Sequence, residues 1–365
     1  MKKVISLVGA RPNFIKIAPL HKAFRTLHPE IDHKICHTGQ HFDENMSKIF
    51  FEELELPRPD FYLGISGGSH TSQTSRIMLE LEKVMEEEKP DLLVVPGDVN
   101  STLAGSLVAS KMGIPLAHVE SGLRSFDRTM PEEINRMVTD VLADYLFVSE
   151  KSGLVNLKKE GISDEKVFFV GNIMIDSLVH YLPKARETDM PGRMGLEEGS
   201  YILGTFHRPS NVDARAHLKG LFDMLNELAA ERKLVFPIHP RTRKNMESFG
   251  LLSTLNPNIL LTDPIGYVDF LSLILHAKLV ITDSGGIQEE TTWLGIPCIT
   301  VRDNTERPVT TEIGTNILAG TDFENVKKHA FRILDGEKPS GEVPELWDGK
   351  TAERIVEILS EKLIT

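Results

Sequence analysis

Short apolar runs rich in β-branched residues alternate with longer helical patterns along almost the whole chain. Several of the runs are continuously apolar, which is typical of parallel strands covered by helices on both faces. Between them, apolar residues recur at helical spacing, as in Ile77–Met85. This alternation predicts doubly wound α/β domains built on parallel sheets. The strand candidates of the first half are Lys3–Val8, His33–His37, Asp91–Val95, Pro115–Val119, Tyr145–Val148 and Val167–Val170.

The alternation is interrupted between His180 and Ser200, where prolines and glycines stand among charged residues. Because these residues punctuate regular structure, we interpret the stretch as a linker or irregular connection. Two Rossmann-like domains are predicted, over residues 1–180 and 181–349. The helical pattern Thr351–Leu363 could pack on either domain, and we assign residues 350–365 to the N-terminal one. The strand candidates of the second half are Tyr201–Phe206, Leu234–Ile238, Asn258–Leu261, Leu279–Thr282 and Pro297–Val301.

Charge and cysteine content narrow the classes of function. With 41 Lys and Arg against 53 Asp and Glu, the chain carries a formal net charge of −12. Such a protein repels nucleic acid and anionic membranes, so we expect neither as a partner, while local cations can still bind an anionic substrate. Cys36 and Cys298 lack CxxC spacing, and no apolar run reaches the roughly 18 residues of a membrane helix. These features predict a cytoplasmic protein without a disulfide framework.

Polar residues gather just after the strands of the first half, where doubly wound sheets bind ligands. Arg11 and Lys16 follow the first strand and bring two cations close to a predicted helix N-terminus, which favours anion binding. The same pattern also fits an ordinary strand–helix turn with solvated charges.

Carboxylates follow the next two strands. Asp98 and Glu120 each stand at a predicted strand end, although an Asp in this position often caps the next helix. Glu132 and Glu133 lie in the first turn of a helix that continues to Arg136, where acids also complement the helix dipole. Three acids around one crevice suit general acid/base chemistry, because neighbouring carboxylates push their pKa values apart.

The second half contains the most specific motif, Asp283–Glu290, which follows an apolar strand and opens a helix. Its Ser-Gly-Gly start can present backbone N–H groups to a phosphate without a Cβ in the way. His207 and Arg208 follow an earlier strand, and Arg302–Pro308 adds charge after the next one. A lone histidine is more often structural than catalytic, but this one stands where the crevice is expected.

Several common motifs are missing from the sequence. No GxxxxGK[ST] loop or GxGxxG fingerprint occurs, which argues against a P-loop hydrolase and a dinucleotide oxidoreductase. His37 and His41 are four residues apart, but Gly39 between them argues against a helix that presents both to a metal.

Together these motifs resemble the non-hydrolysing UDP-N-acetylglucosamine 2-epimerases over nearly the whole chain. The matching segments are Gly9–Pro12, Thr38–His41, Gly97–Asp98, His118–Arg124, Pro131–Glu133, His207–Arg208, Asp283–Glu290 and Arg302–Pro308. The resemblance implies a glycosyltransferase-B-like fold, with the active site in the cleft between the domains, and a cytoplasmic homodimer that needs no metal or redox cofactor. It also implies a role in cell-surface polysaccharide precursor synthesis.

The resemblance implies roles for individual residues. Asp98, Glu120 and Glu132 look like the catalytic acids, and His207 is placed with them. UDP elimination would give a 2-acetamidoglucal, and re-addition on the opposite face would complete epimerisation. The residues that look like substrate or UDP contacts are Arg11, Lys16, Arg136, Phe270, Ser284, Gly285, Gly286, Glu290 and Arg307.

The sequence departs from many bacterial members of that family at several positions. The Arg-Gln pair linked to activation by substrate appears here as Ser72-Gln73, although Gln40, His41 and Arg208 are present. The loop 126–130 is shorter, which leaves room for another UDP-2-acetamido sugar such as a diacetamido uronic acid derivative. The alternative hypotheses for the function are a glycosyltransferase of the same architecture, a hydrolysing epimerase and a catalytically inactive nucleotide-sugar-binding protein.

Overall fold

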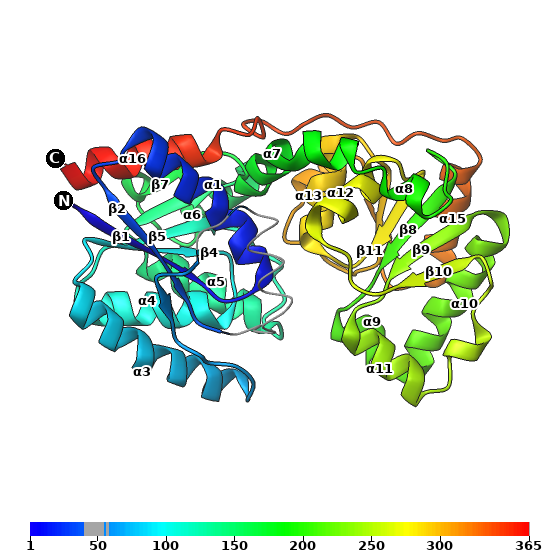
Figure 1. The fold of residues 1–365 in the computed structure, drawn as a ribbon, viewed down its shortest axis with the longest axis horizontal. Helices are drawn as coiled ribbons and strands as arrows, with labels where there is room; N and C mark the ends of the chain where they lie inside the picture. The colour runs from blue at the N-terminus through cyan, green and yellow to red at the C-terminus, as the bar shows by residue number, and fades with distance from the viewer. Residues whose placement is uncertain (40–54, 56–57, 365) are drawn as a thin grey trace. The chain divides into compact units, whose positions relative to one another are not determined.

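The computed structural model describes residues 1–39, 55 and 58–364, which divide into two compact units. Unit 1 contains Met1–His180 together with Glu345–Thr365, and unit 2 contains Tyr181–Pro344. Each unit is built on one parallel sheet flanked by helices, so the α/β class predicted from the alternating pattern is confirmed (Figure 1).

The sheet of unit 1 has the strand order β3-β2-β1-β4-β5-β6-β7. Its strands are β1 (Lys3–Val8), β2 (Asp32–His37), β3 (Phe61–Tyr62), β4 (Leu92–Pro96), β5 (Leu116–Ser121), β6 (Tyr145–Val148) and β7 (Val167–Phe169). Its helices are α1 (Arg11–Leu27), α3 (His70–Glu88), α4 (Asn100–Met112), α5 (Pro131–Leu142), α6 (Lys151–Lys159) and α16 (Thr351–Ile364), with α7 (Ile173–Glu187) continuing into unit 2. The central strands read as unbroken apolar runs because both of their faces are covered.

The sheet of unit 2 has the order β10-β9-β8-β11-β12-β13. Its strands are β8 (Tyr201–Thr205), β9 (Lys233–Pro237), β10 (Ile259–Thr262), β11 (Leu279–Thr282), β12 (Cys298–Thr300) and β13 (Asn316–Leu318). Its helices are α8 (Met190–Arg193), α9 (Pro209–Val212), α10 (Arg215–Glu231), α11 (Pro240–Ser248), α12 (Tyr267–Leu275), α13 (Gly285–Leu294), α14 (Val309–Glu312) and α15 (Phe323–Leu334).

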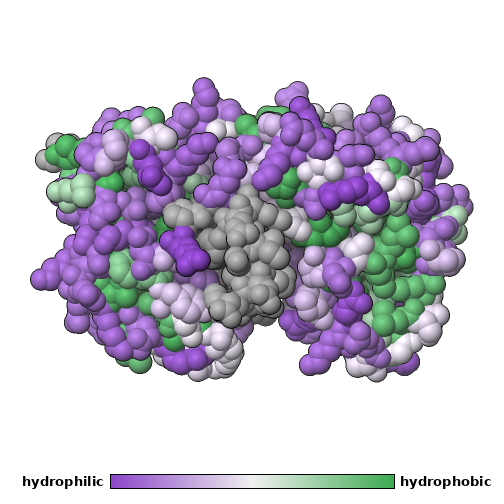
Figure 2. Space-filling model, in the orientation of Figure 1, coloured by the Kyte–Doolittle hydropathy of each residue, from purple (hydrophilic) through white to green (hydrophobic). Residues whose placement is uncertain are grey.

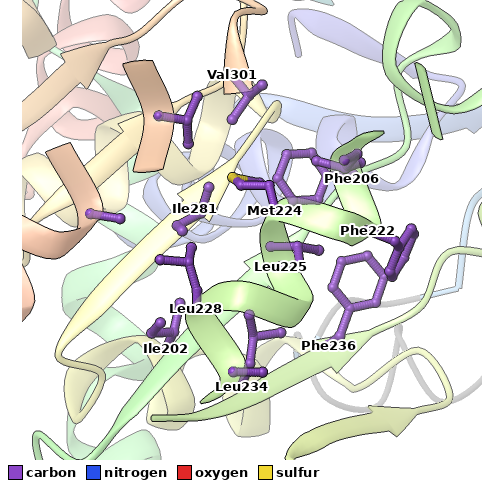
Figure 3. Close-up of a cluster of buried hydrophobic side chains, with 14 of the residues drawn as sticks. Ile202, Phe206, Phe222, Met224, Leu225, Leu228, Leu234, Phe236, Ile281 and Val301 are labelled. Carbon is purple, nitrogen blue, oxygen red and sulfur yellow. The ribbon is translucent and has the colours of Figure 1, made fainter. Parts of the chain in front are cut away.

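The largest apolar cluster of unit 2 lies between α10 and the sheet. Figure 3 shows Phe222, Leu225 and Leu228 of α10 among Phe236 and Ile281 of the strands. All five side chains are buried, and burial of one such side chain contributes roughly 1.5–3 kcal/mol. The rigid sheet that results holds the loops at its carboxyl edge. On the face drawn in Figure 2, hydrophilic residues dominate the surface, in keeping with the net charge of −12.

The predicted strands agree with the structure to within two residues at each end. The short strands β3 and β13 were not predicted, because two or three residues are too few for a pattern. The interpretation of residues 180–200 as an irregular linker was wrong over most of its length. There α7 continues through Pro183 to Glu187, and α8 follows. The reason is burial, because Tyr181, Leu182 and Ala185 are packed into the interior and outweigh the helix-breaking effect of the proline.

Helix α16 belongs to unit 1, where it packs against α1. Its apolar face is buried through Ile355, Val356 and Leu359. Its first turn is capped by Asp176 of α7, which accepts hydrogen bonds from Thr351 N at 3.1 Å and Ala352 N at 2.6 Å. The last residues of the described chain therefore complete the N-terminal core.

Candidate active site

Each sheet reverses its strand order at one pair of neighbouring strands, β1 and β4 in unit 1 and β8 and β11 in unit 2. In doubly wound sheets, ligands bind beyond the carboxyl ends of such a pair. The residues singled out from the sequence follow β1, β4 and β5 in unit 1 and β8, β11 and β12 in unit 2. The topology thus gathers most of them at two sheet edges, one in each unit.

Lys16 and Glu120 form a buried ion pair beside Gly97, with side chains only 8% and 2% exposed. Gly97 has a φ of +66°, and a Cβ there would lie 3.0 Å from Lys16 Nζ. A side chain at this position would therefore push the lysine away, and glycine also suits the positive φ. The ends of α1, β4 and β5 meet at this point.

Asn13 fixes the turn that follows β1. Its Oδ1 accepts hydrogen bonds from Gly9 N at 3.1 Å and Ala10 N at 3.0 Å, and its Nδ2 donates to Pro96 O at 3.3 Å. This side chain links the ends of β1 and β4, and the sequence analysis did not single it out. Arg11 begins α1, and the position of its side chain lies outside the described part of the chain.

Glu120 adopts an unusual backbone conformation, with a φ of 71°. The pairing of β5 with β6 shifts register between Val119 and Ser121, so Glu120 lies in a bulge. A non-glycine residue held in such a region costs about 1–3 kcal/mol, and such strain concentrates at functional sites. The bulge turns the carboxylate toward Lys16 instead of leaving it in the regular alternation of the strand.

Asp98 is held by α5 and does not cap a helix. Arg136, whose side chain is 2% exposed, donates to Asp98 Oδ2 at 2.5 Å, and Asn135 Nδ2 donates to the Asp98 carbonyl oxygen at 2.8 Å. The N-cap of α4 is Val99, with no side-chain cap. Thus the helix-cap alternative for Asp98 is wrong, and its carboxylate is paired with a buried cation.

The neighbouring acids Glu132 and Glu133 have different surroundings. Glu133 is 1% exposed, and its carboxylate accepts hydrogen bonds from Ser125 N at 2.9 Å, Phe126 N at 2.9 Å and Arg136 at 2.7 Å. Burial acts to raise the pKa of Glu133, but the hydrogen bonds from Ser125 and Arg136 outweigh it and lower the pKa. Glu132 is half-buried in the same helical turn. Glu133 therefore anchors the preceding loop, whereas Glu132 makes none of these contacts.

At the edge of unit 2, Asp283 organises the turn after β8. The register pairs Thr205 with Thr282, which brings His207 beside Asp283. The Asp283 carboxylate accepts hydrogen bonds from His207 N at 3.1 Å and Arg208 N at 2.9 Å, and His207 Nδ1 lies 3.1 Å away. Burial acts to raise the pKa of Asp283, but His207 outweighs it and the pKa is lowered. Asp283 is thus a positioning group for His207.

Three arginines surround Glu306 near the start of α13. Its carboxylate lies 2.7 Å from Arg302, 2.9 Å from Arg307 and 3.4 Å from Arg208. A Cβ on Gly285 would lie 2.8 Å from Arg307 NH1, so this glycine allows the guanidinium to approach the helix N-terminus. Ser284 is the N-cap and makes no side-chain cap. Backbone N–H groups of Gly285 and Gly286 in the first helical turn, with the arginines, form a setting suited to a diphosphate.

Glu290 lies on α13 and Phe270 lies on α12. Burial raises the pKa of Glu290 to about 7, the hydrogen bond with Tyr267 opposes this rise, and the charge of Glu289 adds to it. A protonated carboxyl can donate as well as accept a hydrogen bond. Phe270 is partly buried against the apolar cluster that contains Leu273.

Of the residues considered for substrate activation, the structure describes Gln73 in unit 1 and Arg208 in unit 2. Gln40 and His41 lie outside the described residues. Gln73 is buried in α3, and its Oε1 accepts a hydrogen bond from Asn100 at 2.7 Å. Arg208 belongs to the arginine group of unit 2.

Within residues 1–39, 55 and 58–364, no helix combines the length and apolar character needed to cross a bilayer. The same residues contain no group of three or more His, Cys, Asp or Glu arranged to hold a metal ion.

Residues 25–360 match the family model described as UDP-N-acetylglucosamine 2-epimerase. A UDP-N-acetylglucosamine 2-epimerase of Methanocaldococcus jannaschii is 45% identical, with 98% of this chain and 99% of the relative covered. The crystal structure of the Methanocaldococcus jannaschii UDP-GlcNAc 2-epimerase in complex with UDP-GlcNAc and UDP superposes with a TM-score of 0.92 over 99% of this chain and 100% of that chain, at 45% identity.

A UDP-2,3-diacetamido-2,3-dideoxy-D-glucuronate 2-epimerase of Pseudomonas aeruginosa is 40% identical, over 98% of this chain and 99% of the relative. These likenesses extend through both units and include the segments that form the two sheet edges. The chain therefore belongs to the UDP-N-acetylglucosamine 2-epimerase family and is an epimerase.

Proposed function

We propose that the chain interconverts UDP-N-acetylglucosamine and UDP-N-acetylmannosamine without hydrolysing either. The observation that carries this proposal is the group of carboxylates at the β1/β4 edge, where Asp98 and Glu120 are each paired with a buried cation. A transferase needs at most one base in this position. Membership of the epimerase family supports the same assignment.

The chemistry explains why more than one acid is needed. The hydrogen on carbon 2 of the sugar is not next to a carbonyl group, so its direct removal is very difficult. Departure of UDP gives carbon 1 oxocarbenium character, which acidifies that hydrogen. One carboxylate then takes the proton to give 2-acetamidoglucal and UDP. Return of a proton on the opposite face and re-addition of UDP complete the epimerisation.

We assign the proton transfers to Asp98 and Glu120, with Glu132 assisting, and leave open which group acts as base. Asp98 follows β4, and Glu120 lies near the carboxyl end of the neighbouring strand β5. General acid/base groups contribute typically 10²–10⁴-fold to rate. The positive charge of Lys16 compensates the negative charge of Glu120, and that of Arg136 compensates Asp98.

We assign the UDP moiety to groups of unit 2, together with Arg11. As UDP leaves it gains negative charge, which His207, Arg307 and the N-terminus of α13 would stabilise electrostatically. Glu290 would bind the ribose, and Phe270 would lie near the uracil. The open first turn of α13 and the arginines around it support this assignment.

The same proposal includes a cytoplasmic homodimer that serves the synthesis of cell-surface polysaccharide precursors. The free cysteines Cys36 and Cys298, both buried, suit a reducing compartment. Light scattering coupled to size-exclusion chromatography tests the dimer, and an elution mass of 40.8 kDa would contradict it.

Proton NMR of the purified protein with UDP-N-acetylglucosamine in D₂O tests the reaction. We expect the signals of UDP-N-acetylmannosamine, with deuterium at carbon 2 and no free N-acetylmannosamine. Steady accumulation of the free sugar would indicate a hydrolysing enzyme instead.

The substitution Asp98→Asn tests the catalytic assignment. We expect kcat to fall at least about 100-fold, as for loss of a general acid or base, while the Kd for UDP stays nearly unchanged. Asp91→Asn is the matched control, because Asp91 lies at the other end of β4, where it accepts a hydrogen bond from Lys3 N. Equal losses of turnover and UDP affinity in Asp98→Asn would contradict the catalytic role.

A second substrate is favoured by one specific observation. The relative that is 40% identical acts, by its name, on a diacetamido uronic acid derivative, and its identity is close to that of the N-acetylglucosamine epimerase at 45%. Parallel assays with both UDP-sugars decide the matter. A kcat/KM at least tenfold higher for the diacetamido substrate would reassign the chain to that reaction.

A further inference from the structure

A fully buried ion network lies beneath the carboxyl ends of β4 and β5. His118 and Asp140 have no exposed surface, and His118 Nδ1 lies 2.6 Å from Asp140 Oδ1. His118 Nε2 is 2.8 Å from the carbonyl oxygen of Gly97. The other oxygen of Asp140 accepts hydrogen bonds from Gly122 N at 3.0 Å and Arg124 at 2.7 Å. The network thus links α5 to the backbone at the carboxyl ends of β4 and β5.

The partners decide the protonation of this network. The Gly97 carbonyl oxygen can only accept, so His118 Nε2 carries a proton. Burial acts to raise the pKa of Asp140, but His118 and Arg124 outweigh it and the pKa is lowered. The other ring nitrogen, Nδ1, lies 2.6 Å from Asp140 Oδ1, so both ring nitrogens of His118 are hydrogen-bonded.

The backbone groups held by this network flank both carboxylates assigned to the chemistry. Gly97 immediately precedes Asp98, and its positive φ of +66° makes the direction of the next residue sensitive to how its carbonyl is held. Glu120 lies between His118 and Gly122, in the bulge where its own φ is 71°. One network therefore holds the backbone before Asp98 and on both sides of Glu120.

We propose that His118 and Asp140 are positioning residues for proton transfer at carbon 2, which hold Asp98 and Glu120 at a fixed separation through Gly97 and Gly122. This inference rests on the proposed epimerase function. Neither residue touches the substrate in this role, and the effect is on the geometry of the two carboxylates. A misplacement of about 1 Å at a catalytic group is enough to slow a reaction by about 100-fold.

A merely structural role predicts a different set of measurements. Loss of a structural network lowers the folded fraction, and UDP affinity and turnover then fall together. Loss of a positioning network slows one chemical step in a folded enzyme. Because the groups assigned to UDP binding lie chiefly in unit 2, UDP affinity should remain when the network of unit 1 is altered.

Asp140→Asn is the test, with Asp144→Asn as its matched control. Asp144 Oδ2 also accepts a hydrogen bond at 3.0 Å from a backbone N–H of β5, but from Leu116 at the opposite end of the strand. We expect Asp140→Asn to lower kcat by about 100-fold while KM and the Kd for UDP change by less than about threefold. Asp144→Asn should keep the kcat of the unaltered enzyme.

A substrate deuterated at carbon 2 supplies a readout that a structural role would not move. In Asp140→Asn the proton transfer at carbon 2 becomes slower than cleavage of the bond between carbon 1 and UDP, so the isotope effect on kcat should increase. His118→Gln is the second variant, because the neutral amide can satisfy only part of the network, and it should show the same split between kcat and KM. Circular dichroism and calorimetry establish the folded fraction of each variant.

The outcomes separate this inference from the function on which it rests. An unaltered enzyme that does not exchange deuterium at carbon 2 overturns the proposed function, and this inference with it. If the unaltered enzyme turns over, the positioning role is overturned by a normal kcat in folded Asp140→Asn and His118→Gln. It is equally overturned if both variants lose UDP affinity in proportion to kcat or fail to fold.

Discussion

At the residue scale, the two acids in the first turn of α5 illustrate how neighbours in sequence can differ in function. The Glu133 carboxylate accepts hydrogen bonds from the backbone of Ser125 and Phe126 and from Arg136, whereas Glu132 is half-buried and makes none of these contacts. Both acids favour the helix dipole. Only the direction of each side chain separates an anchor from a candidate catalytic group.

We expect Glu133→Gln to destabilise the protein and Glu132→Gln to lower turnover. Breaking a buried ion pair by removal of one charge costs about 3–5 kcal/mol, and Glu133→Gln removes one of the two carboxylates that compensate Arg136. Glu132→Gln should change the free energy of unfolding by less than about 0.5 kcal/mol, as surface substitutions usually do. Urea titration and NMR turnover assays measure the two effects. Identical behaviour of both variants would contradict the division of roles.

Glu290 provides a prediction about pH. Its pKa is raised from 4.5 to about 7, so the folded state binds its proton more tightly than the unfolded state does. Stability from this group is present below pH 4.5 and is lost as pH rises through about 7, by an amount on the order of 3 kcal/mol.

Urea titrations of the unaltered protein and Glu290→Gln between pH 5 and pH 8 measure this effect. The glutamine variant should gain stability relative to the unaltered protein as the pH rises, because it has no proton to lose. A difference between the two proteins that stays constant over this range would show that Glu290 does not titrate there.

At the element scale, the N-termini of two helices differ in how their backbone N–H groups are satisfied. The first turn of α13 has no side-chain cap and faces the arginine group, whereas α16 is capped by a buried aspartate from another helix. An uncapped helix start leaves backbone N–H groups for a ligand, and a capped one is committed to the fold. The same sequence signal, a helix start after a turn, therefore has two different uses in this chain.

We expect Asp176→Ala to destabilise the docking of α16 by about 1–2 kcal/mol, the usual cost of losing an N-cap. Asp322→Ala is the control, because Asp322 caps a different helix, α15. Its exposed side chain accepts one hydrogen bond from Glu324 N. Hydrogen exchange of the peptides that cover α16 measures the effect. Unchanged protection in Asp176→Ala would show that the cap does not hold the helix.

At the scale of the whole molecule, the chain leaves unit 1, builds unit 2 and returns to unit 1 for its last helix. Leu359 of α16 is fully buried in unit 1. The stability of the N-terminal core therefore depends on residues at the far end of the sequence.

We expect Leu359→Ala to cost about 2–5 kcal/mol, as large-to-small core substitutions do. The loss should appear in unit 1, so hydrogen exchange should increase in β1 and β4 while β8 and β11 stay protected. Equal increases in both sheets would show that the two units unfold as one.

The sequence alone was sufficient for every strand except the short β3 and β13, and for the α/β class and the family, because covered parallel strands are apolar throughout and the motifs stand at strand ends. It also identified Asp98, Glu120 and the Asp283–Glu290 segment as candidates. The helical structure of residues 180–187 was decided by tertiary burial, because packing of Tyr181 and Ala185 keeps α7 intact around Pro183. The pairing of Lys16 with Glu120, of Arg136 with Asp98 and of His118 with Asp140 was likewise decided by tertiary structure. Such contacts join segments that are distant along the chain, and their directions depend on strand order, a bulge and burial, which local patterns do not encode.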